Sequence, residues 1–188
     1  SMTKEIHDII DIILKHWTMK EIVFKDVNEV FNISSDLFNL QKLLNTMNIW
    51  QQFVLIMMCK VYDNDLLEHQ KAKKKNGDKY DDKGIDINDV YDKYKQCKME
   101  LKKKIKSSNN ANQLRNGMNS IGGHNVLLEK EINHGDFIKI IEFLEVTGLL
   151  NKYTVKKTRT VKNFVVVSHN TQDVYELLRH SALFKDII

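Results

Sequence analysis

Apolar residues near the start of the chain recur at the spacing of one helix face. They are Ile6, Ile9, Ile10, Ile13 and Trp17. This period of three to four residues predicts an amphipathic helix over residues 4–17. A shorter helix is predicted over 24–31. The stretch "NISSD" at 32–36 then supplies a break and a new N-terminal cap for a further helix over 37–47.

The segment from Ile49 to Tyr62 is apolar almost all round, which is typical of a helix buried inside a domain. The chain then turns polar and lysine-rich over 63–84. This stretch has too little apolar surface to offset the entropy cost of ordering it, so we expect a mobile insertion. A second polar stretch, 106–125, is expected to form a flexible loop for the same reason.

Helix caps mark two further helices. Between the polar stretches, Asp86 is the predicted cap of a helix with Asp89 in its first turn. The buried face of that helix comprises Val90, Tyr94, Cys97 and Leu101. Asn133 is the predicted cap of the next helix, which Gly148 ends.

Two alternating segments, "LLNKYTV" and "KNFVVVS", flank a basic turn and predict a half-buried β-hairpin. A last helix begins after Asn170. Its expected core residues are Val174, Leu177, Leu178, Leu183 and Phe184. The order after residue 48 is therefore helix, helix, helix, β-hairpin, helix. This order predicts a mainly α (α+β) winged-helix domain, whose hairpin projects as a wing beside the third helix.

Composition adds a mild positive charge. The 188 residues carry a formal net charge of +4, with a sequence pI near 8.9. Only local clustering of charge can therefore argue for an anionic partner. One cluster is the predicted hairpin, 151–169, which has five cations and no acid. The other lies in the second helix of the domain and is relieved only by Glu100; it comprises Lys95, Lys98, Lys102, Lys103, Lys104 and Lys106.

The two cysteines, Cys59 and Cys97, lie inside apolar helical patterns, which favours buried thiols in a reducing compartment over a disulfide. No apolar run has the length of a membrane span, and no leader-like segment opens the chain. We expect Ser1 and Met2 to be a cloning remnant and the sequence to be a fragment of a longer protein.

Motifs for nucleotide or metal chemistry are missing from the sequence. It contains no GxxxxGK[ST] phosphate loop, no CxxC or HxxxH pair, and no calcium loop with glycine sixth and glutamate twelfth. No histidine has an evident partner for general-base catalysis. We therefore expect these residues to form no enzyme and to hold no metal or cofactor.

The hairpin cations are the strongest candidate site. Their mutual repulsion costs stability, so a polyanion beside them is the simplest explanation for the cluster. The predicted DNA-binding residues are Lys152, Lys156, Lys157, Arg159 and Lys162, with Lys102, Lys103 and Lys104 as second choice. If all five hairpin cations met phosphates, log affinity would fall with log salt at a slope of roughly −4 to −5. A solvated helix face is an equally good interpretation of the lysine run.

The third helix of the domain is acidic, because Asp136, Glu142 and Glu145 outnumber Lys139. Phosphates repel such a helix, so we expect contacts to the DNA backbone and weak sequence preference. The same acidity supports an alternative, in which the domain is chiefly a protein-docking module. Glu142, Glu145 and Phe184 would then contact the partner, although residues such as Phe184 more often close a domain's own core.

Five stretches carry a resemblance to a known family. They are "QQFVLIMMCKVY", "DINDVYDKYKQC", "FIKIIEFLEVTGLL", "TRTVKNFVVV" and "DVYELLRHSALFKDII". In order and spacing they resemble the C-terminal winged-helix domain of the replication-initiator family of cell division control protein 6, origin recognition complex subunit 1 and their archaeal relatives. The final "SALFKDII" is more similar to cell division control protein 6. Residues 3–47 resemble the family's AAA+ lid, and 48–188 its winged helix.

The resemblance implies a DNA replication factor of the nucleus that acts in the cell cycle within the pre-replicative complex. Its winged helix would contact double-stranded origin DNA together with subunits of the origin recognition complex or the replicative helicase. ATP and Mg would be bound by an ATPase module that this sequence lacks. The fragment itself is expected to be monomeric, to have no enzymatic activity and to bind no membrane.

Overall fold

The chain is described by a computed structural model over residues 2–17, 24–76, 84–116, 125–157 and 159–188. Side chains are described at 3–11, 35–71, 84–108, 125–156 and 159–188. The chain divides into two compact units, Ser1–Met47 and Asn48–Ile188, which we call unit 1 and unit 2.

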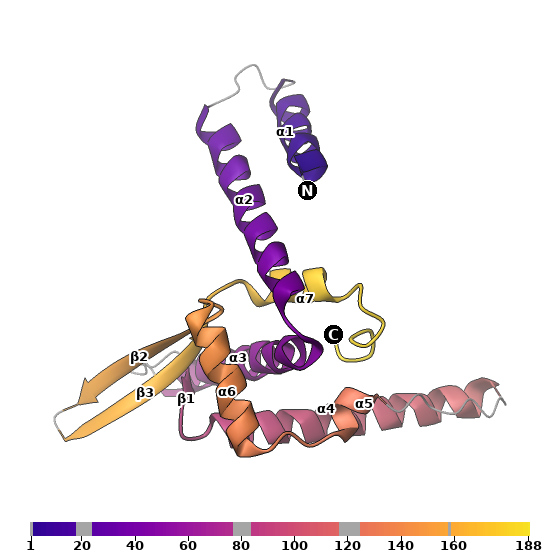
Figure 1. The fold of residues 1–188 in the computed structure, drawn as a ribbon, viewed down its shortest axis with the longest axis vertical. Coiled ribbons are helices and arrows are strands. Elements are labelled where there is room, and N and C mark those ends of the chain that lie inside the picture. The colour runs from indigo at the N-terminus through magenta and orange to yellow at the C-terminus, as the bar shows by residue number, and fades with distance from the viewer. Residues whose placement is uncertain (1, 18–23, 77–83, 117–124, 158) are drawn as a thin grey trace. The chain divides into compact units, whose positions relative to one another are not determined.

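Unit 1 is a pair of helices, α1 (Met2–Trp17) and α2 (Phe24–Thr46), that lie side by side (Figure 1). The predicted helix at 4–17 is confirmed. The predicted break at 32–36 is wrong, because α2 runs through it without interruption. Asn and Ser cost a helix interior only a few tenths of a kcal/mol each, and the segment has no glycine or proline to stop it. The assignment of 3–47 to an AAA+ lid stays a prediction.

Unit 2 begins with α3 (Ile49–Asn76), whose residues 53–59 are all fully buried. The predicted mobile insertion is wrong over 63–76, because α3 continues to Asn76. Asp65 is buried and pairs with Lys93 at 2.6 Å, which anchors this continuation. Residues 77–83 lie outside the described part of the chain.

The next helix, α4 (Val90–Asn116), likewise continues through 106–116, where we expected a loop. Residues 117–124 lie outside the described part. The predicted cap is also wrong. Asp86 belongs to a two-residue strand, β1 (Ile85–Asp86), and α4 begins after Asp89, whose carbonyl accepts from the Lys93 N–H at 2.9 Å. A strand this short carries no readable alternation, so the sequence pattern did not reveal it.

The predicted third helix is confirmed as α6 (His134–Val146), which follows the single-turn helix α5 (Val126–Glu129). The Asn133 side chain caps α6 by accepting from the Asp136 N–H at 2.8 Å. Gly148 ends the helix at a φ of +76°, in the left-handed region that glycine tolerates.

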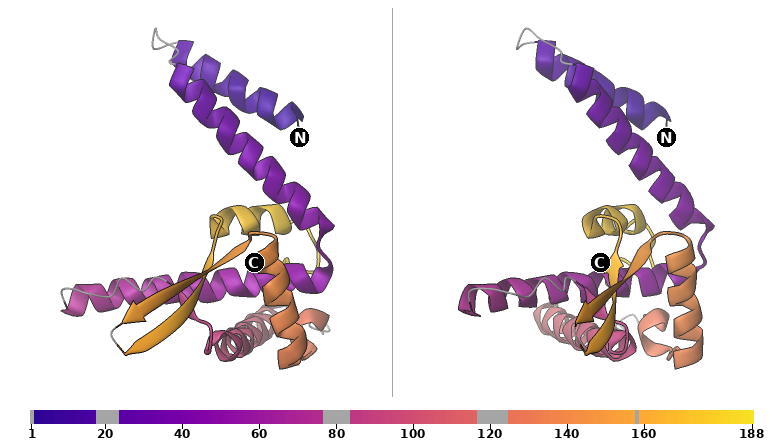
Figure 2. Two further views of the ribbon diagram at one scale, coloured as in Figure 1. Left: turned by 60° about the vertical axis from the view of Figure 1, so that its left-hand side comes forward. Right: turned by 90° about the vertical axis from the view of Figure 1, so that its left-hand side faces the viewer.

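The hairpin consists of β2 (Leu150–Lys157) and β3 (Thr160–Val167), both longer toward the turn than predicted. The sheet is antiparallel with the order β1-β3-β2, and the register runs from Leu150 opposite Val167 to Lys157 opposite Thr160. Three helices, a small antiparallel sheet and a projecting hairpin form the predicted winged helix (Figure 2).

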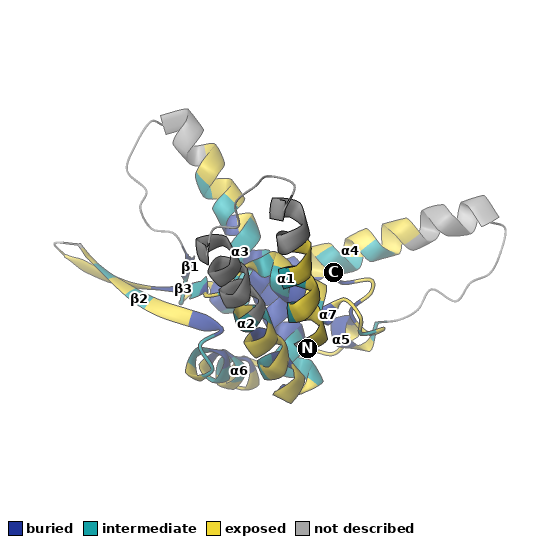
Figure 3. Cartoon of the chain, turned by 90° about the horizontal axis from the view of Figure 1, so that it is seen from above, coloured by how far each residue is buried: buried dark blue, intermediate teal, exposed yellow. Residues whose placement is uncertain are grey.

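The core of unit 2 surrounds α3, which contacts α4, α6, α7 (Thr171–Leu178), β1 and β3 (Figure 3). The rings of Tyr94 and Phe137 lie 4.8 Å apart between α4 and α6. At α7, the Asp63 carboxylate accepts hydrogen bonds from the hydroxyls of Thr171 and Tyr175, each at 2.9 Å. Leu183, an expected core residue, is 48% exposed, whereas Tyr175, which was not expected in the core, is buried. None of the described helices is long and apolar enough to cross a membrane.

Gly84 and Gly135 allow a matched test of packing at the base of the wing. A Cβ on Gly84 would lie 3.1 Å from the Val165 carbonyl oxygen and 3.0 Å from Val166 Cγ1, so β3 and its side chains would have to shift by a few tenths of an ångström. We expect Gly84→Ala to lower the free energy of unfolding by about 1–3 kcal/mol. At Gly135 a Cβ would meet only Asn133 Oδ1, at the ordinary contact distance of 3.4 Å, so Gly135→Ala should raise the free energy of unfolding by about 0.5–1 kcal/mol. Urea denaturation measures both, and equal effects would contradict the close packing at Gly84.

The two free cysteines should be chemically inert in the native protein. Both are buried, and burial raises the pKa of the Cys59 thiol to about 12 and that of Cys97 above its usual range. At pH 8 roughly one Cys59 thiol in ten thousand is ionised. We expect neither thiol to react with an aromatic disulfide reagent within minutes, whereas both should react in guanidinium chloride. Rapid native labelling would show that α3 opens locally.

Candidate nucleic-acid interface

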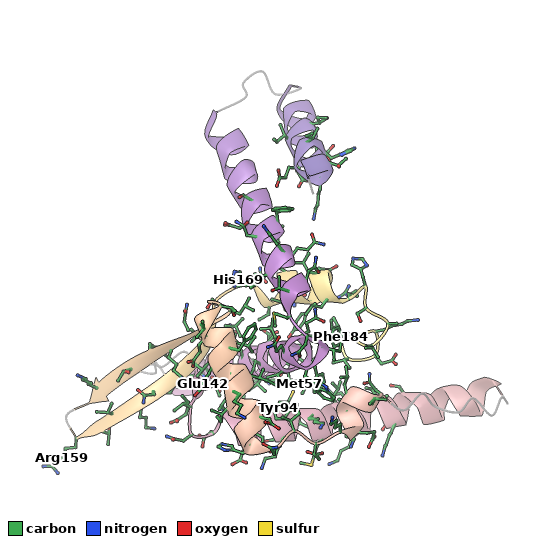
Figure 4. All side chains as sticks on the ribbon, viewed as in Figure 1. Met57, Tyr94, Glu142, Arg159, His169 and Phe184 are labelled. Carbon is green, nitrogen blue, oxygen red and sulfur yellow. The ribbon has the colours of Figure 1, made fainter. Side chains whose placement is uncertain are left out.

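The hairpin β2–β3 is called the wing from here on. Each strand has eight residues, so the wing is about 26 Å long. Its turn end lies away from the helices, and Figure 4 shows Arg159 there. Cross-strand contacts stiffen it. Tyr153 stacks on Phe164 with ring centroids 5.4 Å apart, and the Thr154 hydroxyl donates to the Asn163 side chain at 2.8 Å.

The register places the wing cations on opposite faces. Lys156 pairs with Val161, and Lys162 pairs with Val155. Paired residues share a face, and successive residues of a strand alternate between faces. Lys156 and Lys162 therefore lie on opposite faces of the wing, with Arg159 at the turn between them.

Three wing cations are free. The side chains of Lys156, Arg159 and Lys162 are exposed, and no carboxylate in the described part of the chain lies within 4.0 Å of their charged nitrogens. The side chain of Lys157 lies outside the described residues, although its backbone pairs with Thr160. The predicted concentration of charge therefore exists toward the turn end of the wing.

Lys152 is different from the other wing cations. Its Nζ lies 2.6 Å from Oε1 of Glu145, in the last turn of α6. The structure thus joins one predicted DNA contact to one predicted partner contact, and each neutralises the other. Sequence spacing carries no signal for this pair, because the β2 register decides which face Lys152 occupies.

The lysine run in α4 is divided by its surroundings. Lys98 is buried, where it donates to the Lys130 carbonyl and lies 3.6 Å from Glu131. Its burial lowers the pKa of the ammonium group. Lys102 pairs with Glu129 at 3.0 Å, whereas Lys103 and Lys104 are exposed. The second-choice DNA contacts therefore do not form one free cationic face.

The predicted docking residues also separate. Glu142 is exposed on α6 (Figure 4). Phe184 is fully buried in the core of unit 2, so its predicted role as a partner contact is wrong and the core-closing alternative holds. Val146, at the end of α6, is 89% exposed.

A cavity of about 330 Å³ lies beside α3 and α4, lined by acids and lysines that include Asp65, Lys93, Glu100 and Lys104. The Asp65–Lys93 pair already satisfies much of its charge. In the described part of the chain, no group of three or more His, Cys, Asp or Glu side chains is placed to hold a metal ion. The described residues of the cavity therefore offer no set of metal ligands.

Comparisons with known proteins give a distant likeness to solved structures. No protein-family model and no curated protein sequence matches it. The structure of the Aeropyrum pernix Orc1 protein in complex with DNA is similar over 94% of this chain, with 12% sequence identity and a TM-score of 0.49. The matched region is 36% of that protein's chain. A likeness this distant assigns the chain to no family.

Proposed function

We propose that unit 2 binds double-stranded DNA through its wing, mainly by contacts to phosphates. The observation that carries this proposal is the set of three exposed cations that have no ion-pair partner among the described residues, on a projecting hairpin without acids. A cluster of like charges repels itself, and a phosphate backbone relieves that repulsion with release of counterions.

The arrangement of the cations favours a groove over a flat surface. Lys156 and Lys162 face opposite ways, so one strand of DNA cannot meet both from one side. Within a groove, each of these lysines faces the phosphates of a different strand, and Arg159 enters first. With Lys152 paired and Lys157 included, the expected slope of log affinity against log salt is about −3 to −4.

Sequence preference should be weak, because α6 is poorly suited to read bases. In winged helices the third helix is the element that faces the major groove. Here its exposed carboxylate, Glu142, would meet phosphates of the same sign. Asp136 adds a second acid that pairs only loosely with Lys139, at 3.7 Å.

The biological setting we propose is DNA replication initiation. The five stretches that resemble the cell division control protein 6 and origin recognition family support it. In this setting the chain is a nuclear, non-enzymatic part of a larger ATP-dependent initiator that helps to place the replicative helicase on origin DNA. The module that binds ATP and Mg would lie elsewhere in that protein.

Protein docking is a second candidate function, favoured by the exposed acid and apolar side chains of α6. Glu142 and the 89% exposed Val146 offer a surface for a basic partner, such as an origin recognition or helicase subunit. This surface does not overlap the free wing cations, so both functions are compatible with one domain.

Replacing Lys156, Arg159 and Lys162 together by alanine should weaken binding to a fluorescent DNA duplex at least tenfold at about 50 mM salt. The loss should be similar for unrelated sequences, because the lost contacts are to phosphates. The salt slope should flatten by about 2–3. Fluorescence anisotropy across a salt series measures both quantities.

The control for the triple variant is Lys185→Ala, which removes one exposed cation from the C-terminal turns of unit 2. It should change affinity and slope much less than the triple variant. Unchanged DNA binding in the triple variant would refute the proposed function.

Reversing one charge on α6 separates docking from DNA binding. We expect Glu142→Lys to leave duplex affinity equal or higher, because it replaces an exposed acid by a cation. The same variant should lose co-purification with origin recognition or helicase subunits. Retained co-purification would count against docking through α6.

A further inference from the structure

The pair formed by Lys152 and Glu145 sits where the wing joins the body of unit 2. Lys152 Nζ lies 2.6 Å from Glu145 Oε1. That oxygen is shielded from solvent and has no hydrogen-bond partner, so the contact is one of opposite charges without hydrogen-bond geometry. The Lys152 side chain is 40% exposed and that of Glu145 20%. The pair is therefore half-buried, unlike the Lys139–Asp136 pair, whose side chains are 78% and 60% exposed.

Packing holds both partners in place. Glu145 belongs to the last turn of α6, which contacts β2. Lys152 is directly opposite Val165, a fully buried residue of the central strand β3. On its other side, Val165 pairs with Ile85 of β1. The backbone on each side is fixed by helix and sheet, so the two side chains meet without ordering a loop.

The face of the wing that carries the paired Lys152 also carries a second lysine, which has no carboxylate partner among the described residues. Lys156 is four residues further along β2, about 13 Å toward the turn, and alternation places it on the face of Lys152. It is exposed and has no carboxylate within ion-pair distance among the described residues. One face thus has a neutralised cation at its base and a free cation near its end.

We propose that Glu145 limits the DNA affinity of the wing by holding Lys152 in an internal ion pair. This inference rests on the proposed DNA-binding function. Glu145 confines phosphate contacts to the outer half of the wing, because it neutralises the cation at the base. It is a determinant of affinity that acts through Lys152 and does not itself contact DNA.

The free-energy cost of breaking the Lys152–Glu145 pair explains why a DNA phosphate does not replace Glu145 as the partner of Lys152. Moving the ammonium group to a phosphate leaves the shielded oxygen of Glu145 without its cation, and an uncompensated, partly buried charge is expensive. The gain from one phosphate contact is offset by that loss. Lys152 therefore contributes little to binding in the native chain.

Glu145→Gln in the 188-residue chain tests the proposal, because it keeps the side-chain size and frees Lys152. Duplex affinity at about 50 mM salt should rise about threefold or more, and the salt slope should steepen by about 0.9, the value for one added phosphate contact. The double variant Glu145→Gln with Lys152→Ala should lose both gains. Lys152→Ala alone should weaken binding less than Lys156→Ala.

Glu176→Gln is the matched control. It removes the same charge and frees Arg179, its partner at 3.0 Å, on α7 and away from the wing. A gain in affinity and slope as large as that of Glu145→Gln would show a general charge effect and overturn the inference. So would a gain that persists without Lys152.

The outcomes also separate this inference from the proposed function. If the native chain binds duplex DNA and Glu145→Gln changes nothing, the inference fails while the proposed function stands. If neither the native chain nor the variant binds, both fail. Binding by the variant alone supports the role of Glu145 and shows that the ion pair lowers the DNA affinity of the native wing below detection.

Discussion

Burial of the apolar segment 53–59 of α3 is the constraint on which the rest of unit 2 depends. Seven consecutive side chains are fully buried, so this helix needs cover on every side. Each large side chain among them gains about 1.5–3 kcal/mol from leaving water. The cover comes from α4, α6, α7 and the sheet. The buried end of β3 is therefore packed against α3. The wing projects because its inner half is held in this core while its outer half has nothing to cover.

Cations near the core of unit 2 are paired, whereas those at the turn end of the wing are exposed to solvent. Near the core, lysines find carboxylates or carbonyls, as Lys93 does with Asp65 and Lys98 with the Lys130 carbonyl. A cation there must be paired, because an isolated charge next to apolar groups is costly. Toward the turn end of the wing that requirement disappears, since water solvates Lys156 and Arg159. The free cations of the wing therefore lie at the end that is farthest from the core.

Helix propagation explains where the composition of the chain misled prediction. The polar stretches 63–76 and 106–116 bury little apolar surface, and their composition alone favours loops. Both nevertheless continue helices whose first turns are packed in the core. Adding a residue to a formed helix avoids the cost of nucleation. The lysine, glutamate and leucine residues of 63–76 are good helix formers, whereas the serine and asparagine residues of 106–116 cost only a few tenths of a kcal/mol each, and no glycine or proline interrupts that stretch. The continuity of α2 through "NISSD" has the same origin.

Local patterns determined the elements that need only neighbours in sequence: the capped helix α6, its stop at Gly148, the hairpin, and thus the winged-helix order and the cationic wing. Tertiary structure alone decided the two-residue β1, the burial of Phe184 and Lys98, and the pairing of Lys152 with Glu145. The reason is physical. Helix caps and strand alternation act over a few residues, whereas burial and ion pairing depend on which distant segment folds against a side chain. The sequence shows the residue type at each of these positions, but not whether the residue is buried, paired or part of a strand.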